Sequence, residues 1–228
     1  MKYNITGDNL QFVNIEFSPN ETIYAEAGTM VYMSGNVKME SKAKGGIARG
    51  LKRMITGESF FITNFKATGG NGIVAFGGNI PGKIMPINVS EGNWLFQKDA
   101  FLCAEDTVDM DMAFQKKLSS AFFGGEGLIL QRLSGKGTAF IHAAGDFTVI
   151  DLKPGQVYKI STSNVVGWQE GVSYEISSVG GIKTALFSGE GLFITTLTGP
   201  GKAVIQSLSL QDLALALYPY MPKQTSGN

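Results

Sequence analysis

Three glutamates that follow a glycine are the first candidates for chemistry in this chain. They are Glu58, Glu126 and Glu190, and each lies at a Gly-Glu step of similar context. Three carboxylates in equivalent positions could bind a hard cation such as calcium or magnesium. The alternative is structural, because a glutamate beside glycine at the start of a strand can accept backbone N–H bonds. We favour the structural role, since uncompensated carboxylates near one axis would raise one another's pKa.

The single histidine and the single cysteine limit the possible active sites. His142 lies within Phe-Ile-His-Ala-Ala and Cys103 within Phe-Leu-Cys-Ala. One cysteine and one histidine are too few for a Cys/His zinc site. A histidine-dependent triad would have no second histidine to draw on. We expect His142 to be a structural or half-exposed residue on a strand, and Cys103 to be a small buried hydrophobic residue. One cysteine allows no disulfide within the chain, which suits a reducing compartment.

A cationic stretch between residues 42 and 57 is the strongest local departure in charge. It holds no acidic residue before Glu58, and its cations alternate with apolar residues; they are Lys42, Lys44, Arg49, Lys52 and Arg53. Such a segment could form a short amphipathic helix that binds an anionic lipid surface or a partner groove. A solvated connection packed on the sheet is the alternative, and we favour it. If the chain binds an anionic surface, we expect Lys44, Arg49, Lys52 and Arg53 to make the contact.

The elements that would position these residues recur along the chain. Three copies of about 65 residues, at roughly 8–82, 84–147 and 148–212, precede a short tail. Each copy carries the Gly-Glu step and then a Gly-x-Gly sequence, at Gly70/Gly72, Gly135/Gly137 and Gly199/Gly201. Three small units bury their apolar faces best together, so we predict one domain of 228 residues. We interpret the Gly-x-Gly sequences as hairpin turns, because no P-loop lysine follows them.

The composition indicates an all-β protein. Thirty glycines separate short runs rich in Val, Ile, Phe and Thr, as in strands joined by tight turns. Strands are predicted at 60–65, 128–133 and 192–197. Helical periodicity is limited to 47–55, 112–121 and 210–217, and we expect the first two to be helical crossovers between sheet layers. The segment 218–222 is predicted to be a docked aromatic turn before a frayed end.

The glycine-containing motifs resemble those of the prokaryotic relatives of the altered-inheritance-of-mitochondria family. The matching motifs include Gly-Gly-Ile with Gly-Leu-Lys-Arg at 45–53, Phe-Phe-Gly-Gly-Glu-Gly-Leu at 122–128, and Gly-Gly-Ile-Lys-Thr-Ala-Leu-Phe at 180–187. The resemblance covers essentially the whole chain. It implies a triplicated fold similar to the trp RNA-binding attenuation protein, related to short double-stranded β-helices and often trimeric. It implies no reaction; members are mostly uncharacterised, and eukaryotic relatives are tied to mitochondrial inner-membrane organisation.

Charge and segment composition restrict the partners. The chain has 19 basic and 19 acidic residues, so it lacks the basic excess typical of nucleic-acid-binding proteins. Its first residues have no apolar core of a signal peptide, and no apolar run reaches membrane-spanning length. We therefore expect a cytoplasmic protein that needs no cofactor.

Two classes of function follow. The first is a non-catalytic binding or scaffold protein, a homotrimer that acts through protein contacts or an anionic membrane surface and not through nucleic acid. The second is a small-ligand-dependent or metal-dependent enzyme with a site in a cleft between repeats, using Glu126, Glu190 or His142. We favour the first class, because no catalytic constellation is visible in the sequence.

Overall fold

The computed structural model describes residues 1–41, 62–116, 128–178 and 193–221. Nearly all regular structure in these ranges is β, and the described α-helix is the short α3 (Leu210–Leu217). The all-β prediction is therefore confirmed. The predicted helix over 47–55 lies outside the described residues.

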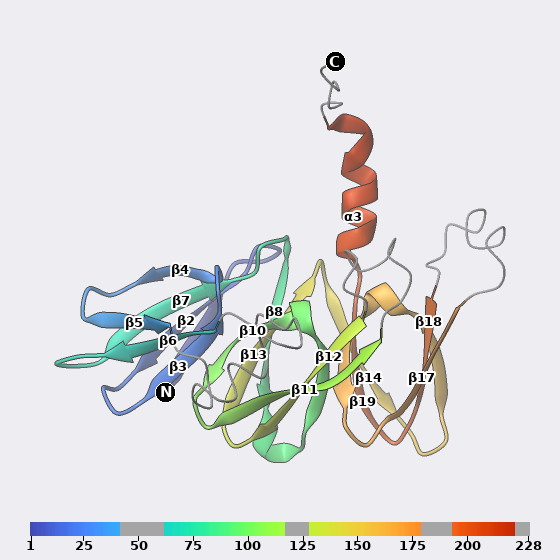
Figure 1. The fold of residues 1–228 in the computed structure, drawn as a ribbon, viewed down its shortest axis with the longest axis horizontal. Helices are drawn as coiled ribbons and strands as arrows, with labels where there is room; N and C mark the ends of the chain where they lie inside the picture. Colours follow the sequence, from blue (N-terminus) through green and yellow to red (C-terminus); the bar gives the residue numbers. More distant parts are fainter. Residues whose placement is uncertain (42–61, 117–127, 179–192, 222–228) are drawn as a thin grey trace.

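Four antiparallel sheets are stacked along the long axis of the molecule (Figure 1). The four-stranded sheet has the order β1 (Lys2–Thr6), β2 (Phe12–Phe17), β7 (Gly72–Gly77), β4 (Met30–Met33). The first six-stranded sheet has the order β5 (Val37–Ser41), β6 (Ile62–Ala67), β3 (Thr22–Glu26), β10 (Phe101–Glu105), β13 (Thr138–Ala144), β8 (Gly82–Asn88). The second has the order β11 (Val108–Lys116), β12 (Leu128–Gly135), β9 (Trp94–Gln97), β16 (Val165–Gln169), β19 (Gly201–Gln206), β14 (Phe147–Leu152). The three-stranded sheet has the order β15 (Val157–Ser161), β18 (Phe193–Thr198), β17 (Ser173–Ser178).

The strand pairings recur at regular intervals in the strand order. β2 pairs with β7, β8 with β13, and β14 with β19. β3 pairs with β6, β9 with β12, and β15 with β18. β4 pairs with β7, β10 with β13, and β16 with β19, each with a register shift at the same place. Two further pairings, β3 with β10 and β9 with β16, complete the six-stranded sheets.

Three apolar clusters fill the spaces between the four sheets. One, with Phe17 and Phe76, lies between the four-stranded and first six-stranded sheets. The second, with Tyr24 and Phe96, lies between the two six-stranded sheets, and the third, with Trp168, borders the three-stranded sheet. Strand β3 shows why these central strands are apolar on both faces: Ile23 and Ala25 enter one cluster while Tyr24 enters the next. Alternation of side chains along a strand produces this division.

The Gly-x-Gly sequences are not hairpin turns, which corrects the prediction. They join strands of different sheets: β6 to β7, β12 to β13, and β18 to β19. Gly135, Gly137 and Gly201 have φ values of 97°, 111° and 137°. Glycine adopts this region without steric cost, so the chain can turn a corner from one sheet into the next.

Two predictions about helices and the C-terminus also need correction. Residues 112–116 of the predicted helix 112–121 belong to strand β11, where Met112 pairs with Gln131 and Lys116 with Leu128; the remainder lies outside the described residues. Pairing with a neighbouring strand overrides a weak helical pattern. Helix α3 confirms the prediction for 210–217. The turn after it, η5 (Tyr218–Tyr220), is not docked, because Tyr218 and Tyr220 are 76 % and 87 % exposed.

Candidate functional site

Strands β9 and β16 pair with each other, and we call this pairing the β9–β16 junction. It joins two groups of strands, because β9 also pairs with β12 and β16 also pairs with β19. Its register sets Phe96 opposite Gly167 and Leu95 opposite Trp168. Gly167 is required here, because a Cβ at this position would overlap the Phe96 ring and lie 2.5 Å from the Leu95 carbonyl oxygen. At the corresponding β3–β10 junction, Cys103 lies opposite Ala25. At each junction the two opposed residues therefore share a limited space: a large residue faces glycine at one, and two small residues face each other at the other.

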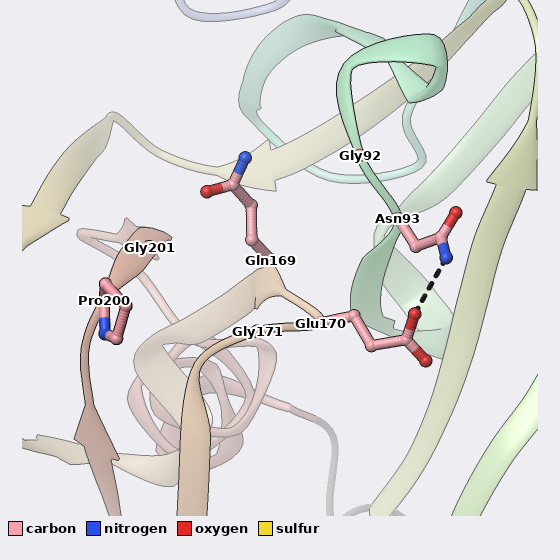
Figure 2. Close-up of a pocket in the computed structure, with 7 residues that line it drawn as sticks. All are labelled: Gly92, Asn93, Gln169, Glu170, Gly171, Pro200 and Gly201. Atoms are coloured by element: carbon pink, nitrogen blue, oxygen red, sulfur yellow. Dashed lines mark hydrogen bonds between the residues drawn. The ribbon is translucent and has the colours of Figure 1, made fainter.

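A surface depression of about 440 Å³ opens beside the β9–β16 junction (Figure 2). Its lining comes from the turn before β9, the end of β16 and the turn before β19: Gly92, Asn93, Gln169, Glu170, Gly171, Pro200 and Gly201. None of these seven residues is a histidine, cysteine, serine or lysine. The depression offers backbone groups, the side-chain amides of Asn93 and Gln169, and one carboxylate, that of Glu170.

The one charge in the depression is already paired. Glu170 accepts a 2.8 Å hydrogen bond from Asn93, drawn in Figure 2, and its carboxylate is 2.8 Å from the Arg132 guanidinium. The hydrogen bonds from Asn93 and Arg132 lower the pKa of Glu170. This carboxylate is thus ionised and neutralised at neutral pH. It is suited to holding the turn in place and not to general acid catalysis.

The other candidates from the sequence fall outside the described ranges. This holds for the cationic residues and for the Gly-Glu glutamates: Lys44, Arg49, Lys52, Arg53, Glu58, Glu126 and Glu190. Within the described ranges, no group of three or more histidine, cysteine, aspartate or glutamate side chains could hold a metal ion. The cation site at the Gly-Glu steps and the anionic-surface site therefore stay predictions.

His142 is buried in strand β13, which agrees with the structural alternative of the prediction and not with the half-exposed one. Its side chain packs against Gly78 and Gly82, where an added Cβ would collide with the imidazole ring. Burial lowers the pKa of His142, and a hydrogen bond with the Ile80 backbone opposes this. The neutral ring thus fills a space bounded by glycines, away from the depression of Figure 2, which it does not line.

The lowered pKa of His142 predicts a loss of stability in acid. Because the unfolded chain binds this proton more readily, the contribution of the neutral ring is complete above about pH 6.5 and is lost as the pH falls below that value. We expect His142→Gln to lower the free energy of unfolding by roughly 1–2 kcal/mol above pH 7. The difference from wild type should shrink towards pH 5 in urea titrations. A difference that stays constant with pH would contradict this account.

Cys103 is fully buried, as predicted. It lies in β10 and contacts the cluster around Phe17 and Phe76. Burial raises the pKa of its thiol well above the ordinary value. A thiol held in its protonated form is a poor nucleophile, so Cys103 fills space in the core.

Strands β4 and β15 depart from the recurring pattern of strand pairing, because, within the described ranges, one pairing made by their counterparts is missing in each. The strands that correspond to β4, namely β10 and β16, pair with β3 and β9. Among the residues that the structure describes, β4 ends its sheet, and so does β15, which corresponds to β3 and β9. These edges are apolar: Val31 and Tyr32 of β4 are 57 % and 47 % exposed, and Val157 of β15 is 52 % exposed. An apolar edge without a partner strand is a template for pairing with another chain.

Sequence reasoning missed these two edges as particular sites. The signal was available in part, because Met30–Met33 has no charged residue and β15 has one, Lys159. Natural edge strands usually carry charges or proline that prevent pairing. Only the topology of the described strands shows that β4 and β15 lack a neighbour that their counterparts have.

Comparison with family models assigns the chain to one family. The family model for mitochondrial biogenesis AIM24 matches residues 3–208. The chain belongs to the AIM24 family. An uncharacterised protein of Streptococcus pyogenes serotype M6 is 32 % identical over 230 residues, covering 96 % of this chain and 90 % of that protein.

The fold of this chain is also represented among solved structures. A crystal structure of a Streptococcus pyogenes protein superposes with a TM-score of 0.81 at 29 % identity, covering 96 % of this chain and 99 % of that one. The family resemblance of the glycine-containing motifs is thus confirmed. Among the described residues of this AIM24 chain, no helix is long and apolar enough to cross a membrane.

Proposed function

We propose that this AIM24 chain consists of three homologous six-stranded units, β2–β7, β8–β13 and β14–β19. The recurring pairings support this division, and so do equivalent side-chain bonds to the backbone. Ser34 accepts from the Ile73 N–H, Glu105 from Thr138 and Gln169 from Lys202, at 3.0, 2.9 and 2.9 Å. A residue in the same place of each unit therefore ties the end of one strand to the start of another. The arrangement fits a fold similar to the trp RNA-binding attenuation protein.

The open edges of the first and third units are complementary in this scheme. Within the chain, the second strand of one unit pairs with the third strand of the next, as β3 does with β10. β15 and β4 are the second and third strands that have no such partner in the described part of the chain. Applying the register of the two internal junctions places Tyr32 opposite Ile160 and Met33 opposite Lys159 of another copy. The unpaired β4 and β15 edges are the observation that carries this proposal.

Pairing of β4 with β15 of another copy is head-to-tail, because two different surfaces meet. Such an interface forms a ring if the rotation closes and a filament if it does not. A ring of three chains has no free edge of this kind and agrees with the trimer that the family resemblance implies. The two edges lie at opposite ends of the elongated body, with β4 at one end and the sheet that holds β15 at the other (Figure 1).

The function best supported by this geometry is that of a non-catalytic scaffold. The closed assembly would present repeated surfaces to protein partners or to an anionic membrane surface, in the cytoplasm and without nucleic acid. Sedimentation velocity tests the assembly: we expect a species of three times the 24.4-kDa chain mass that persists on dilution. A monomer at micromolar concentration would overturn the assembly and leave the family assignment intact.

The cationic stretch provides a separate test for the membrane version of this function. We expect charge reversal at Arg49, Lys52 and Arg53 to weaken binding to phosphatidylserine vesicles at least about a hundredfold at low salt, because each of the three cations near such a surface contributes about 1 kcal/mol and about 1.4 kcal/mol is tenfold. Wild-type binding should weaken steeply with salt. Reversal of Lys136, Lys153 and Lys202, three exposed lysines outside β4 and β15, is the matched control. Equal binding by all variants would remove the lipid surface from the proposal.

The rival class is a small-ligand-dependent or metal-dependent enzyme. The depression of Figure 2 favours it, because it lies at the junction of the second and third units. At the first junction larger residues stand at corresponding places, with Glu21 in place of Gly92, Thr107 in place of Gly171 and Lys136 in place of Pro200. A metal or metabolite of defined mass retained in native mass spectra would move this class ahead of the scaffold.

A further inference from the structure

Two short 3-10 helices have the same conformation and the same place relative to a sheet junction. η2 (Lys98–Ala100) precedes β10, and η4 (Thr162–Asn164) precedes β16. Each begins after a residue with non-helical backbone angles, Gln97 or Ser161. Each ends where the next N–H bonds back to the first carbonyl: Phe101 to Lys98, and Val165 to Thr162. The carbonyl oxygens of Lys98 and Thr162 are therefore equivalent, and each can accept a second hydrogen bond.

At the β9–β16 junction, which is the second junction along the chain, the Thr162 carbonyl oxygen accepts such a second hydrogen bond. The side-chain amide of Gln97, the last residue of β9, donates a 2.8 Å hydrogen bond to the Thr162 carbonyl oxygen. This bond links β9 to η4, directly before the strand β16 that pairs with β9. It closes the end of the β9–β16 junction with a polar contact between neighbouring strand groups.

The first junction has a glutamate where the second has this glutamine. Glu26 is the last residue of β3, opposite Ile62 of β6, as Gln97 is the last residue of β9, opposite Leu130 of β12. Glu26 is partly buried. An ionised carboxylate has no proton to donate, so only the neutral acid can reproduce the contact that the Gln97 amide makes.

The surroundings of Glu26 favour the neutral acid. Burial raises its pKa to about 7, with the nearby Asp99 acting in the same direction and Lys98 opposing it. These two charged groups both belong to η2. From the adjacent strands, Ile62 of β6 carries no charge, and the Cys103 thiol of β10, which pairs with the neighbouring Ala25, stays protonated.

We propose that Glu26 is a pH-sensitive latch at the β3–β10 junction: its protonated carboxyl group donates a hydrogen bond to the Lys98 carbonyl oxygen, and ionisation breaks that link. The pKa in the folded state lies above that of the unfolded chain. The stabilisation is therefore complete below about pH 4.5 and is lost as the pH rises through about 7. The latch acts within one chain, so it does not depend on the proposed trimer.

The substitution Glu26→Gln tests the latch, because it supplies a permanent donor of the same shape. We expect wild type and Glu26→Gln to melt at similar temperatures at about pH 4.5, and the variant to melt roughly 3–6 °C higher at about pH 8.5. Glu175→Gln, at an exposed position of β17, is the control and should show no such divergence. Carbon-13 spectra of the glutamate carboxyl groups in wild type should contain one resonance that titrates near pH 7 and is absent from Glu26→Gln.

Either readout can overturn the proposal. A melting difference between wild type and Glu26→Gln that is the same at both pH values would leave no role for ionisation. Glutamate resonances that all titrate below pH 5.5 would do the same, and this spectrum needs only the wild-type chain if the variant does not fold. If the protein proves to be a monomer but the melting difference between wild type and Glu26→Gln still depends on pH, the proposed trimer is wrong and the latch at Glu26 stands.

Discussion

A chain carrying Met33→Cys and Lys159→Cys is expected to become covalently linked to its neighbours when oxidised. The register of the internal junctions places these two residues directly opposite each other across two copies. Directly opposed residues of an antiparallel pair have Cβ atoms about 4.5–5.5 Å apart, which a small adjustment brings within disulfide range. Most of the protein should migrate as linked chains, up to a three-chain band, on non-reducing gels. The native Cys103 is buried and should not interfere.

A shifted pair supplies the control for this experiment. Met33→Cys with Val157→Cys keeps both residues on the same strands but moves one of them two positions along β15. Diagonal neighbours are about 7–8 Å apart, too far for a disulfide without backbone movement. Linking of the shifted pair as efficiently as the matched pair would show that collisions, and not a defined register, produce the bands. Linking of neither pair would contradict β4–β15 association.

The substitution Gly167→Cys is expected to be among the most destabilising single changes in the described part of the chain. Its side chain would enter the space of the Phe96 ring at the β9–β16 junction. Overpacking of a well-filled site costs typically about 1–3 kcal/mol, and contact with the Leu95 carbonyl places this change at the upper end of that range. Urea denaturation should show a free energy of unfolding lower by about 3 kcal/mol. Gly70→Ala, where an added Cβ meets nothing within 4 Å, should be neutral within about 0.5 kcal/mol.

The first junction indicates how the damage can be repaired. Cys103 and Ala25 occupy there the positions of Gly167 and Phe96. The double variant Gly167→Cys with Phe96→Ala copies that pair, and Phe96→Ala alone should cost about 3–5 kcal/mol. We expect the double variant to be more stable than the sum of the two single effects by at least about 1 kcal/mol. Strict additivity would mean that the two junctions are not structurally equivalent.

Spacing along the chain predicted the strands well, because turn glycines and apolar alternation are local signals. The segments predicted at 128–133 and 192–197 correspond to β12 and β18. What those glycines do could not be predicted locally. A Gly-x-Gly between two strands reads as a hairpin, whereas here it sends the chain into a different sheet, a choice determined by packing across the core.

The candidate site depended even more on tertiary context. The strand pattern of β4 resembles that of an internal strand, and nothing in Met30–Met33 alone shows that its neighbour is missing. The role of Glu26 also requires knowledge of the strand register, since only the pairing of β3 and of β9 with their neighbours shows that Glu26 and Gln97 occupy equivalent positions. The helical pattern of residues 112–116 was a weak local preference that pairing with β12 outweighed.

Hydrogen exchange of the assembled wild-type chain, followed by mass spectrometry, tests the central claim most directly. Alternate amides of an edge strand point away from its sheet and exchange quickly unless another strand covers them. If copies associate head to tail, peptides from β4 and β15 should be protected as strongly as β10 and β16, which have partners on both sides. Exchange in β4 and β15 as fast as in the end strands β8 and β14 would contradict the proposed assembly.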